Sequence, residues 1–262
     1  MLPCAARAER LRFPVAFVLV LLLLLLPLTT AMDGIANHLQ AVRQRIQTAE
    51  RAAGRQSGSV QLIAVGKFQP AQSLKRVYEE GQRAFGENYV QEALDKMQAL
   101  QNLSGLEWHL IGPLQSNKTR VVAEHFDWVH TLDREKIARR LSEQRPAHMP
   151  PLNVLLQVNS SNEETKSGVE PAAVSSLAHA IDALPGLRLR GLMSIPAPAD
   201  TYQAQRAAFA PVRALFLQLQ AEGLSVDTLS MGMTQDLEAA IAEGATQVRI
   251  GTALFGPRAA SR

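Results

Sequence analysis

The feature that most constrains the fold is a regular alternation of short apolar segments with longer amphipathic ones. Eight apolar segments have the length and composition of strands, and helical segments separate them. Strands that alternate with helices predict a parallel sheet with crossover connections. The predicted strands are Gln61–Val65, Ala84–Gly86, Trp108–Ile111, Trp128–Thr131, Val154–Val158, Leu187–Met193, Thr228–Ser230 and Gln247–Ile250.

Eight such units close naturally into one α/β barrel of the (β/α)8, or TIM, type, and 262 residues suit a single large domain. An extra N-terminal helix is predicted to begin at Met32, because apolar residues recur at helical spacing from Ile35 to Ile46. The alternative is an open doubly wound sheet, which usually places a glycine-rich G-x-G-x-x-G turn after its first strand. The first strand is followed by Gly66-Lys67-Phe68-Gln69-Pro70 instead, which favours the barrel.

The first 31 residues differ from the rest of the chain. A basic stretch is followed by a continuous apolar run, Phe13–Leu28, and then by small residues. This pattern is typical of a secretory signal peptide, and the run is short for a membrane span. A second interpretation is that Met32 is the true start, which the chemistry of the barrel favours. We divide the chain into an apolar leader, 1–31, and a barrel domain, 32–262. A chain that starts at Met32 is expected to be cytoplasmic, whereas a chain with a genuine leader is expected to be exported or membrane-associated.

Composition excludes several classes of function. The only cysteine is Cys4, so the barrel domain has no disulfide framework and no thiolate metal site. No histidine, aspartate and glutamate cluster has the spacing of metal ligands, so no metal is expected. The formal net charge is +3, and no run of basic residues carries interleaved aromatics, so nucleic acid is not an expected partner. No apolar stripe beyond the helix faces predicts a dimer, so a monomer is expected.

Residues at the predicted strand ends are polar or small. In a barrel the carboxyl ends of the strands meet at one mouth. Lys67 follows the first strand and is the one amine in this set. The loops after the last two strands commonly hold phosphate in such barrels, and here Ser230 and Gly251-Thr252 supply hydroxyls and amides. An aldehyde that carries a phosphate would suit both ends, and pyridoxal 5′-phosphate (PLP) is the common cofactor of that kind.

Taken singly, these residues also have structural interpretations. Lys67 alone would be a solvated loop lysine, and Gly251-Thr252 alone would be a plain turn. Arg249 lies within an apolar strand, so it needs a partner or faces the mouth. His109 and His130 have strand-like neighbours and are expected to be core histidines rather than bases. The prediction of a cofactor site therefore depends on finding Lys67 together with the phosphate-binding residues Ser230, Gly251 and Thr252.

Several segments, in this order, resemble the family of pyridoxal phosphate homeostasis proteins. They are Ala64–Lys67, Phe85–Glu92, Trp108–Lys118, Gln157–Asn159, Lys166–Gly168, Arg190–Met193, Ser230–Met233 and Val248–Gly256. The resemblance implies a single barrel similar to the N-terminal domain of alanine racemase, with Lys67 as the Schiff-base lysine. It implies that Ser230, Gly251 and Thr252 hold the phosphate, that Arg249 approaches the pyridine nitrogen, and that Asn88 lies beside the cofactor. Gly66 and Phe68 depart from the family's usual residues.

The resemblance also implies a function. The family is cytosolic, has no well-established turnover, and buffers or delivers PLP, with PLP-dependent apoenzymes as partners. The alternative is a PLP-dependent amino-acid racemase or a related enzyme. Alanine racemases use a second base, a tyrosine from a separate domain. The tyrosines of the barrel domain, Tyr78, Tyr89 and Tyr202, are predicted on or next to helices. The carrier is therefore favoured, and no catalytic residue is predicted.

Overall fold

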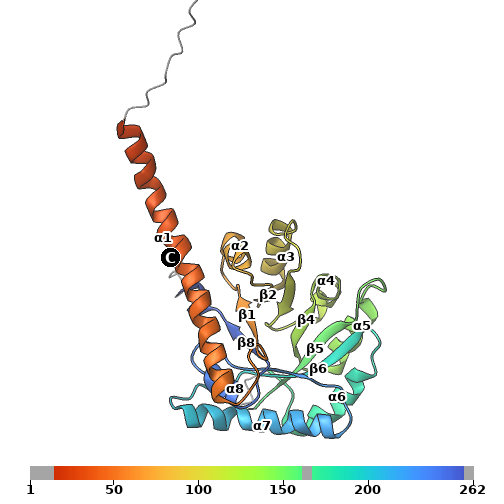
Figure 1. Cartoon of the computed structure of the whole chain (residues 1–262). Coiled ribbons are helices and arrows are strands. Elements are labelled where there is room, and N and C mark those ends of the chain that lie inside the picture. The colour runs from red at the N-terminus through yellow and green to blue at the C-terminus, as the bar shows by residue number, and fades with distance from the viewer. Residues whose placement is uncertain (1–14, 161–166, 257–262) are drawn as a thin grey trace, which may run out of the picture.

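The sheet closes on itself. The computed structural model describes the backbone of residues 15–160 and 167–256, with side chains from residue 34 onward. Eight parallel strands pair in chain order, and the last pairs with the first (Figure 1). The predicted TIM-type barrel is confirmed, and each strand overlaps a predicted one. The strands are β1 Gln61–Val65, β2 Ala84–Glu87, β3 Glu107–Leu110, β4 Trp128–Leu132, β5 Leu152–Val158, β6 Leu187–Ser194, β7 Thr228–Ser230 and β8 Gln247–Ile250.

Helices connect the strands and bury apolar faces against the outside of the sheet (Figure 1). Two short 3-10 turns, η1 Ser116–Lys118 and η2 Pro171–Ala173, precede α4 and α6. The segment after β8 was predicted as a turn, but it forms the short helix α9, which buries Leu254. The helices after the first are α2 Ala71–Glu79, α3 Val90–Ala99, α4 Thr119–His125, α5 Glu135–Gln144, α6 Val174–Asp182, α7 Tyr202–Ala221, α8 Leu237–Ala242 and α9 Thr252–Phe255.

The extra N-terminal helix is present, but it begins earlier than predicted. Helix α1 runs without a break from Val15 to Ala52, because the leucine-rich stretch before Met32 consists largely of strong helix formers. Its later turns bury Leu39, Val42 and Ile46 on one face, against α8 and α9. Residues 1–14 of the predicted leader lie outside the described residues. Within the described part of the chain, no helix combines the length and apolar composition that crossing a bilayer requires.

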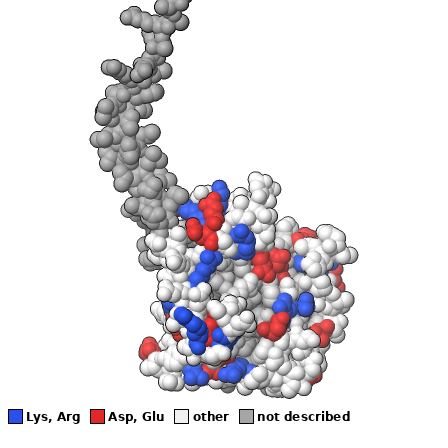
Figure 2. Space-filling model, in the orientation of Figure 1, with Lys and Arg blue, Asp and Glu red and all other residues white. Residues whose placement is uncertain are grey.

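The barrel interior differs from the layer between sheet and helices. The large hydrophobic core lies in that outer layer. A separate small cluster, formed by Trp128, Leu155 and Met193, lies apart from it on β4, β5 and β6. Polar side chains, among them His109 and Arg249, are also buried on the strands. Figure 2 shows charges of both signs interspersed over the visible face of the described residues. That face of the described chain therefore carries no large area of a single charge sign.

Glycine is required at one position in the sheet. Gly191 on β6 has φ of 144°, and a Cβ atom there would lie 2.0 Å from the carbonyl oxygen of Thr228 on β7. The register between β5 and β6 also shifts at this point, between Val154 and Leu155. Both the backbone conformation and the close approach of β7 exclude a side chain.

We predict that Gly191→Ala lowers the free energy of unfolding by about 3 kcal/mol, because backbone strain and overpacking add. Gly58→Ala is the matched control: Gly58 has φ of 83° but open space around its Cβ position, so the loss should be about 1 kcal/mol. Urea unfolding of both variants measures the difference. Equal losses would show that the approach of Thr228 imposes no cost.

Candidate functional site

The closed sheet brings the predicted site residues to neighbouring strand ends. Strand β1 lies between β2 and β8, so Lys67, after β1, is flanked by Asn88 after β2 and by Gly251 after β8. A Cβ atom on Gly251 would lie 3.3 Å from the carbonyl oxygen of Val65, so the turn after β8 contacts the end of β1. Lys67, Asn88 and Gly251 are half-buried, and Thr252 is exposed. These four residues therefore line one side of the mouth.

An ionic cluster holds the backbone on both sides of Lys67. The Lys96 ammonium, from α3, donates to the carbonyl oxygen of Gly66 at 2.6 Å. It also donates to Oε1 of Glu87 and to Oε1 of Glu92, both at 2.7 Å. Glu92 in turn accepts a hydrogen bond from the backbone N–H of Phe68 at 2.6 Å. The Lys96 cluster, formed by Lys96, Glu87 and Glu92, therefore fixes the residues before and after Lys67.

The residues on either side of Lys67, Gly66 and Phe68, are each constrained by a contact with the Lys96 cluster. A Cβ atom on Gly66 would lie 2.4 Å from Oε1 of Glu87, so the Lys96 cluster packs against a position without a side chain. Phe68 has φ of 63°, a left-handed conformation that is rare for a bulky residue. The hydrogen bond from Phe68 to Glu92 helps to hold that conformation.

Two aromatic rings surround the amine of Lys67. Its Nζ lies 5.1 Å from the ring centre of Phe68 and 5.5 Å from that of Tyr89, and the two ring centres are 5.6 Å apart. These distances allow cation–π attraction. Both rings are exposed at the mouth. Tyr89 directly precedes α3, as predicted, but its position beside Lys67 was not apparent from the sequence.

Arg249 is a buried cation whose described hydrogen-bond partners are neutral. Its guanidinium donates to Oγ of Ser230 at 2.8 Å and to the carbonyl oxygen of Ser194 at 3.0 Å. Among the residues that the structure describes, no carboxylate lies within ion-pair distance of it. Burial lowers the pKa of Arg249 to about 10, against a smaller opposite effect of Asp236. A desolvated cation of this kind has spare capacity for an electron-rich ligand group.

Ser230 lies beneath the mouth rather than on its surface. Its side chain is fully buried. Oγ lies 2.9 Å from Nδ1 of His130 and also accepts a hydrogen bond from Arg249. Nε2 of His130 is 2.9 Å from Nδ1 of His109, which is also fully buried. The two predicted core histidines are thus joined by a hydrogen bond. Strand alternation placed each inside the sheet, but only the register shows that they meet.

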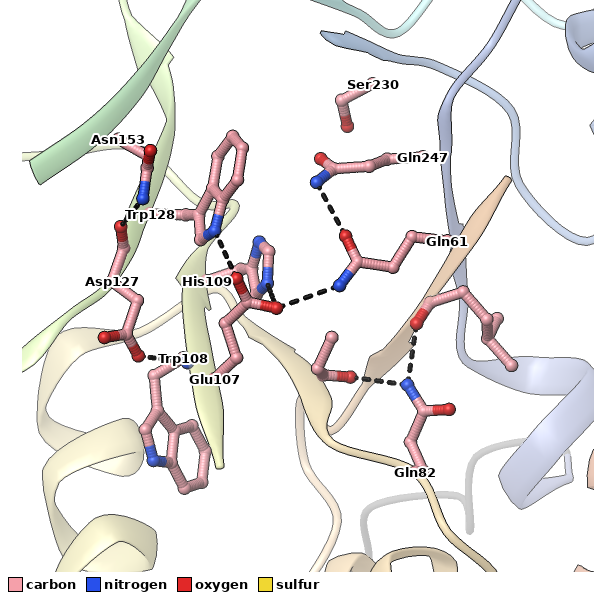
Figure 3. A network of polar contacts seen from close by, with 12 residues as sticks. Gln61, Gln82, Glu107, Trp108, His109, Asp127, Trp128, Asn153, Ser230 and Gln247 are labelled. Carbon is pink, nitrogen blue, oxygen red and sulfur yellow. Dashed lines mark hydrogen bonds and ion pairs between the residues drawn. The ribbon is translucent and has the colours of Figure 1, made fainter. Parts of the chain in front are cut away.

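The series ends on a carboxylate near the start of β3. Oε2 of Glu107 lies 3.4 Å from Nε2 of His109 and accepts from Gln61 at 2.8 Å, while Oε1 accepts from Trp128 at 2.6 Å (Figure 3). Burial alone would raise the pKa of Glu107, but the proximity and charge of His109 and the donors Trp128 and Gln61 lower it to about 2. We call the series from Glu107 through His109, His130 and Ser230 to Arg249 the axial chain.

The donor set of the mouth fits an anionic aldehyde with an aromatic ring. Lys67 offers an amine in a fixed loop, and Arg249 offers a buried cation without a carboxylate. Gly251 and Thr252 open α9, where backbone N–H groups lack helical partners. No group of three histidine, cysteine, aspartate or glutamate residues in the described part of the chain could hold a metal ion. These residues could hold PLP by its aldehyde, its ring and its phosphate.

Comparison with known proteins gives consistent matches over the barrel. Residues 37–259 match the family described as the alanine racemase N-terminal domain. The pyridoxal phosphate homeostasis protein of Pseudomonas aeruginosa is 58% identical over 227 residues, which cover 87% of this chain and 97% of that protein. The Escherichia coli protein of the same name is 53% identical over 229 residues, covering 87% and 98%. The solved structure of PipY from Synechococcus elongatus with PLP bound is 39% identical, with a TM-score of 0.74 over 85% of this chain and 100% of that one.

Glu87 gives the site a pH-dependent element. Burial raises the pKa of this carboxyl group from its ordinary value of 4.5 to about 7, against the hydrogen bond and charge of Lys96. Between these two values the native protein holds a proton that the unfolded chain releases. Stability therefore falls as the pH rises through this window and changes no further above it.

We predict that the wild-type protein loses up to about 3 kcal/mol more unfolding free energy than Glu87→Gln between about pH 5 and about pH 8. The amide keeps the shape of the carboxyl group but does not titrate. Glu79→Gln, on the exposed face of α2, is the control and should follow the wild type. Urea unfolding at the two pH values tests this, and parallel curves for wild type and Glu87→Gln would contradict it.

Proposed function

The chain belongs to the pyridoxal phosphate homeostasis proteins, within the family of alanine racemase N-terminal domains, and from this premise we propose that it binds PLP at the barrel mouth and buffers or delivers it. A relative that covers nearly the same length has been solved with PLP bound. The observation that carries the proposal is the pairing of a held amine, Lys67, with a buried cation that lacks a carboxylate, Arg249.

Lys67 is the tether in this proposal. When bound, the cofactor supplies an aldehyde that condenses reversibly with a primary amine. The Lys96 cluster fixes the backbone of Gly66 and Phe68, so the amine is presented with little loss of conformational freedom. The rings of Phe68 and Tyr89 lie beside the amine at cation–π distances and contact the tether at the mouth. Reversibility is what a carrier needs.

The remaining predicted residues have positions that suit the other ends of the cofactor. Gly251 and Thr252 open α9 and offer amide and hydroxyl donors for the phosphate. Asn88 lies on the opposite side of Lys67. The phosphate contact predicted for Ser230 stays a prediction, because its buried hydroxyl is shared between Arg249 and His130. We propose that Ser230 orients Arg249, whichever part of the cofactor its hydroxyl contacts.

Arg249 suits a carrier but does not exclude a racemase. A cation beside the ring nitrogen disfavours protonation of that nitrogen and weakens the ring as an electron sink. The alternative function, an amino-acid racemase, would need a second base. Tyr89 is the specific observation in its favour, because it lies at the mouth beside Lys67. The Tyr78 hydroxyl, by contrast, donates to the carbonyl oxygen of Ser104.

We predict that borohydride reduction of the protein with PLP fixes the cofactor on Lys67, as peptide mapping of the product would show. Lys67→Arg should bind PLP at least about tenfold more weakly, because the charge remains but the covalent bond is lost. Lys75→Arg, on the exposed face of α2, is the matched control and should bind as the wild type does. A label on another lysine, with Lys67 unmodified, would refute the assignment.

We predict that the PLP-loaded protein does not racemise free alanine at an ordinary enzyme rate. A chiral amino-acid assay at saturating alanine should find turnover far below about 1 s⁻¹. Turnover at or above that rate, abolished in Tyr89→Phe, would replace the carrier with the racemase and identify Tyr89 as its second base.

A further inference from the structure

The hydrogen bonds of the axial chain run in one donor-to-acceptor direction, and this direction decides where the Ser230 hydrogen points. Its three links join Ser230 to His130 at 2.9 Å, His130 to His109 at 2.9 Å and His109 to Glu107 at 3.4 Å. The two links of 2.9 Å are hydrogen bonds, each with one hydrogen and one lone pair, and the third is a longer contact between His109 and a carboxylate. A neutral imidazole carries one N–H and one lone pair. If one ring nitrogen donates a hydrogen bond, the other must therefore accept one.

With both histidines neutral, Glu107 sets the direction. The donors Trp128 and Gln61 hold its carboxylate in the ionised form, so Glu107 can only accept and the hydrogen of His109 lies on Nε2. Nδ1 of His109 then accepts from Nε2 of His130, and Nδ1 of His130 accepts from the Ser230 hydroxyl. The Ser230 hydrogen therefore points down the chain, away from the mouth. The opposite direction would set a lone pair of His109 against the carboxylate.

One added proton reverses the two upper links. A protonated His109 donates through both nitrogens, so its Nδ1 donates to Nε2 of His130. The hydrogen of His130 must then lie on Nδ1, where it donates to Ser230. Oγ of Ser230 now accepts from both His130 and Arg249, and its own hydrogen is free for an acceptor that enters beside Arg249. Nε2 of His109, which makes no hydrogen bond in the structure, keeps its donor facing Glu107.

We propose that His109 takes up one proton from solution when PLP binds, and that this turns the Ser230 hydroxyl toward the cofactor. The inference rests on the proposed PLP site. An electron-rich group of the cofactor beside Arg249 gains a donor only in the protonated state, so binding and proton uptake favour each other. The proton resides on His109 and His130 only relays it, because burial and the charges of His109 and Arg249 hold the pKa of His130 well below its usual range.

The surroundings of His109 suit a proton site. Trp128 stacks on its ring, with centres 5.4 Å apart and planes 11° apart, which fixes the ring between its two partners. The neutral amides Gln61 and Gln247 continue the network across β1 and β8 (Figure 3). The titratable or charged groups facing His109 are Glu107 from β3, Asp127 before β4, His130 from β4 and, through Ser230, Arg249 from β8.

Nitrogen NMR of the wild-type protein, with ¹⁵N-labelled histidine, tests the relay directly. At about pH 8 without PLP, the hydrogen of His130 should lie on Nε2, and His109 should be neutral. With saturating PLP, the hydrogen of His130 should move to Nδ1, and His109 should carry both hydrogens. An unchanged His130 tautomer in a protein that has bound PLP would overturn the inference and leave the proposed function intact. Failure to bind PLP at all would instead refute the proposed function.

Calorimetry provides an independent measurement. PLP is titrated into the protein in buffers of different ionisation enthalpy, which gives the number of protons taken up per PLP bound. At about pH 8, His109→Gln should take up close to one proton fewer than the wild type. His125→Gln, on the exposed end of α4, is the matched control and should be unchanged. Equal proton uptake in wild type and His109→Gln would overturn the inference, whereas the NMR experiment decides it if His109→Gln does not fold.

Discussion

A guanidinium group lies inside the barrel, with no carboxylate of the described residues at ion-pair distance, and much of the polar interior is arranged around that charge. Arg249 is desolvated, so each of its neighbours must supply an acceptor. Ser230 and the carbonyl oxygen of Ser194 do so. Behind Ser230, the two histidines extend the series by hydrogen bonds, and His109 faces the carboxylate of Glu107 at the start of β3. The negative end of the series is thus kept away from the mouth, which leaves the positive end available to a ligand.

A second polar system reaches the mouth from outside the sheet. The Lys96 cluster holds the loop that carries Lys67, and it does so through backbone groups on either side of that residue. In the proposed PLP site, the axial chain sets the charge beneath the cofactor, whereas the Lys96 cluster sets the position of the amine. The two systems share no hydrogen bond in the described structure, so they can be altered separately by mutation. This separation suits a protein whose task is to hold a reactive aldehyde and release it.

Much of the fold could be predicted from the sequence because a period of alternating strands and helices has few topological solutions. The strand ends then identified Lys67, Asn88 and Gly251 as neighbours, since parallel strands share one mouth. The roles of His109 and Lys96 could not be predicted in this way. Which interior residues meet depends on strand register, and the reach of Lys96 depends on how α3 packs over β1 and β2. The early start of α1 was missed because a signal-like apolar run and a helix share the same leucine-rich composition.

The most direct test of this account is a crystal structure of the protein grown with PLP. The account predicts continuous electron density from Nζ of Lys67 to the cofactor, with the phosphate at Gly251 and Thr252 and the ring nitrogen facing Arg249. Density for PLP joined to another lysine, or a cofactor bound outside the barrel mouth while Lys67 remains free, would contradict it.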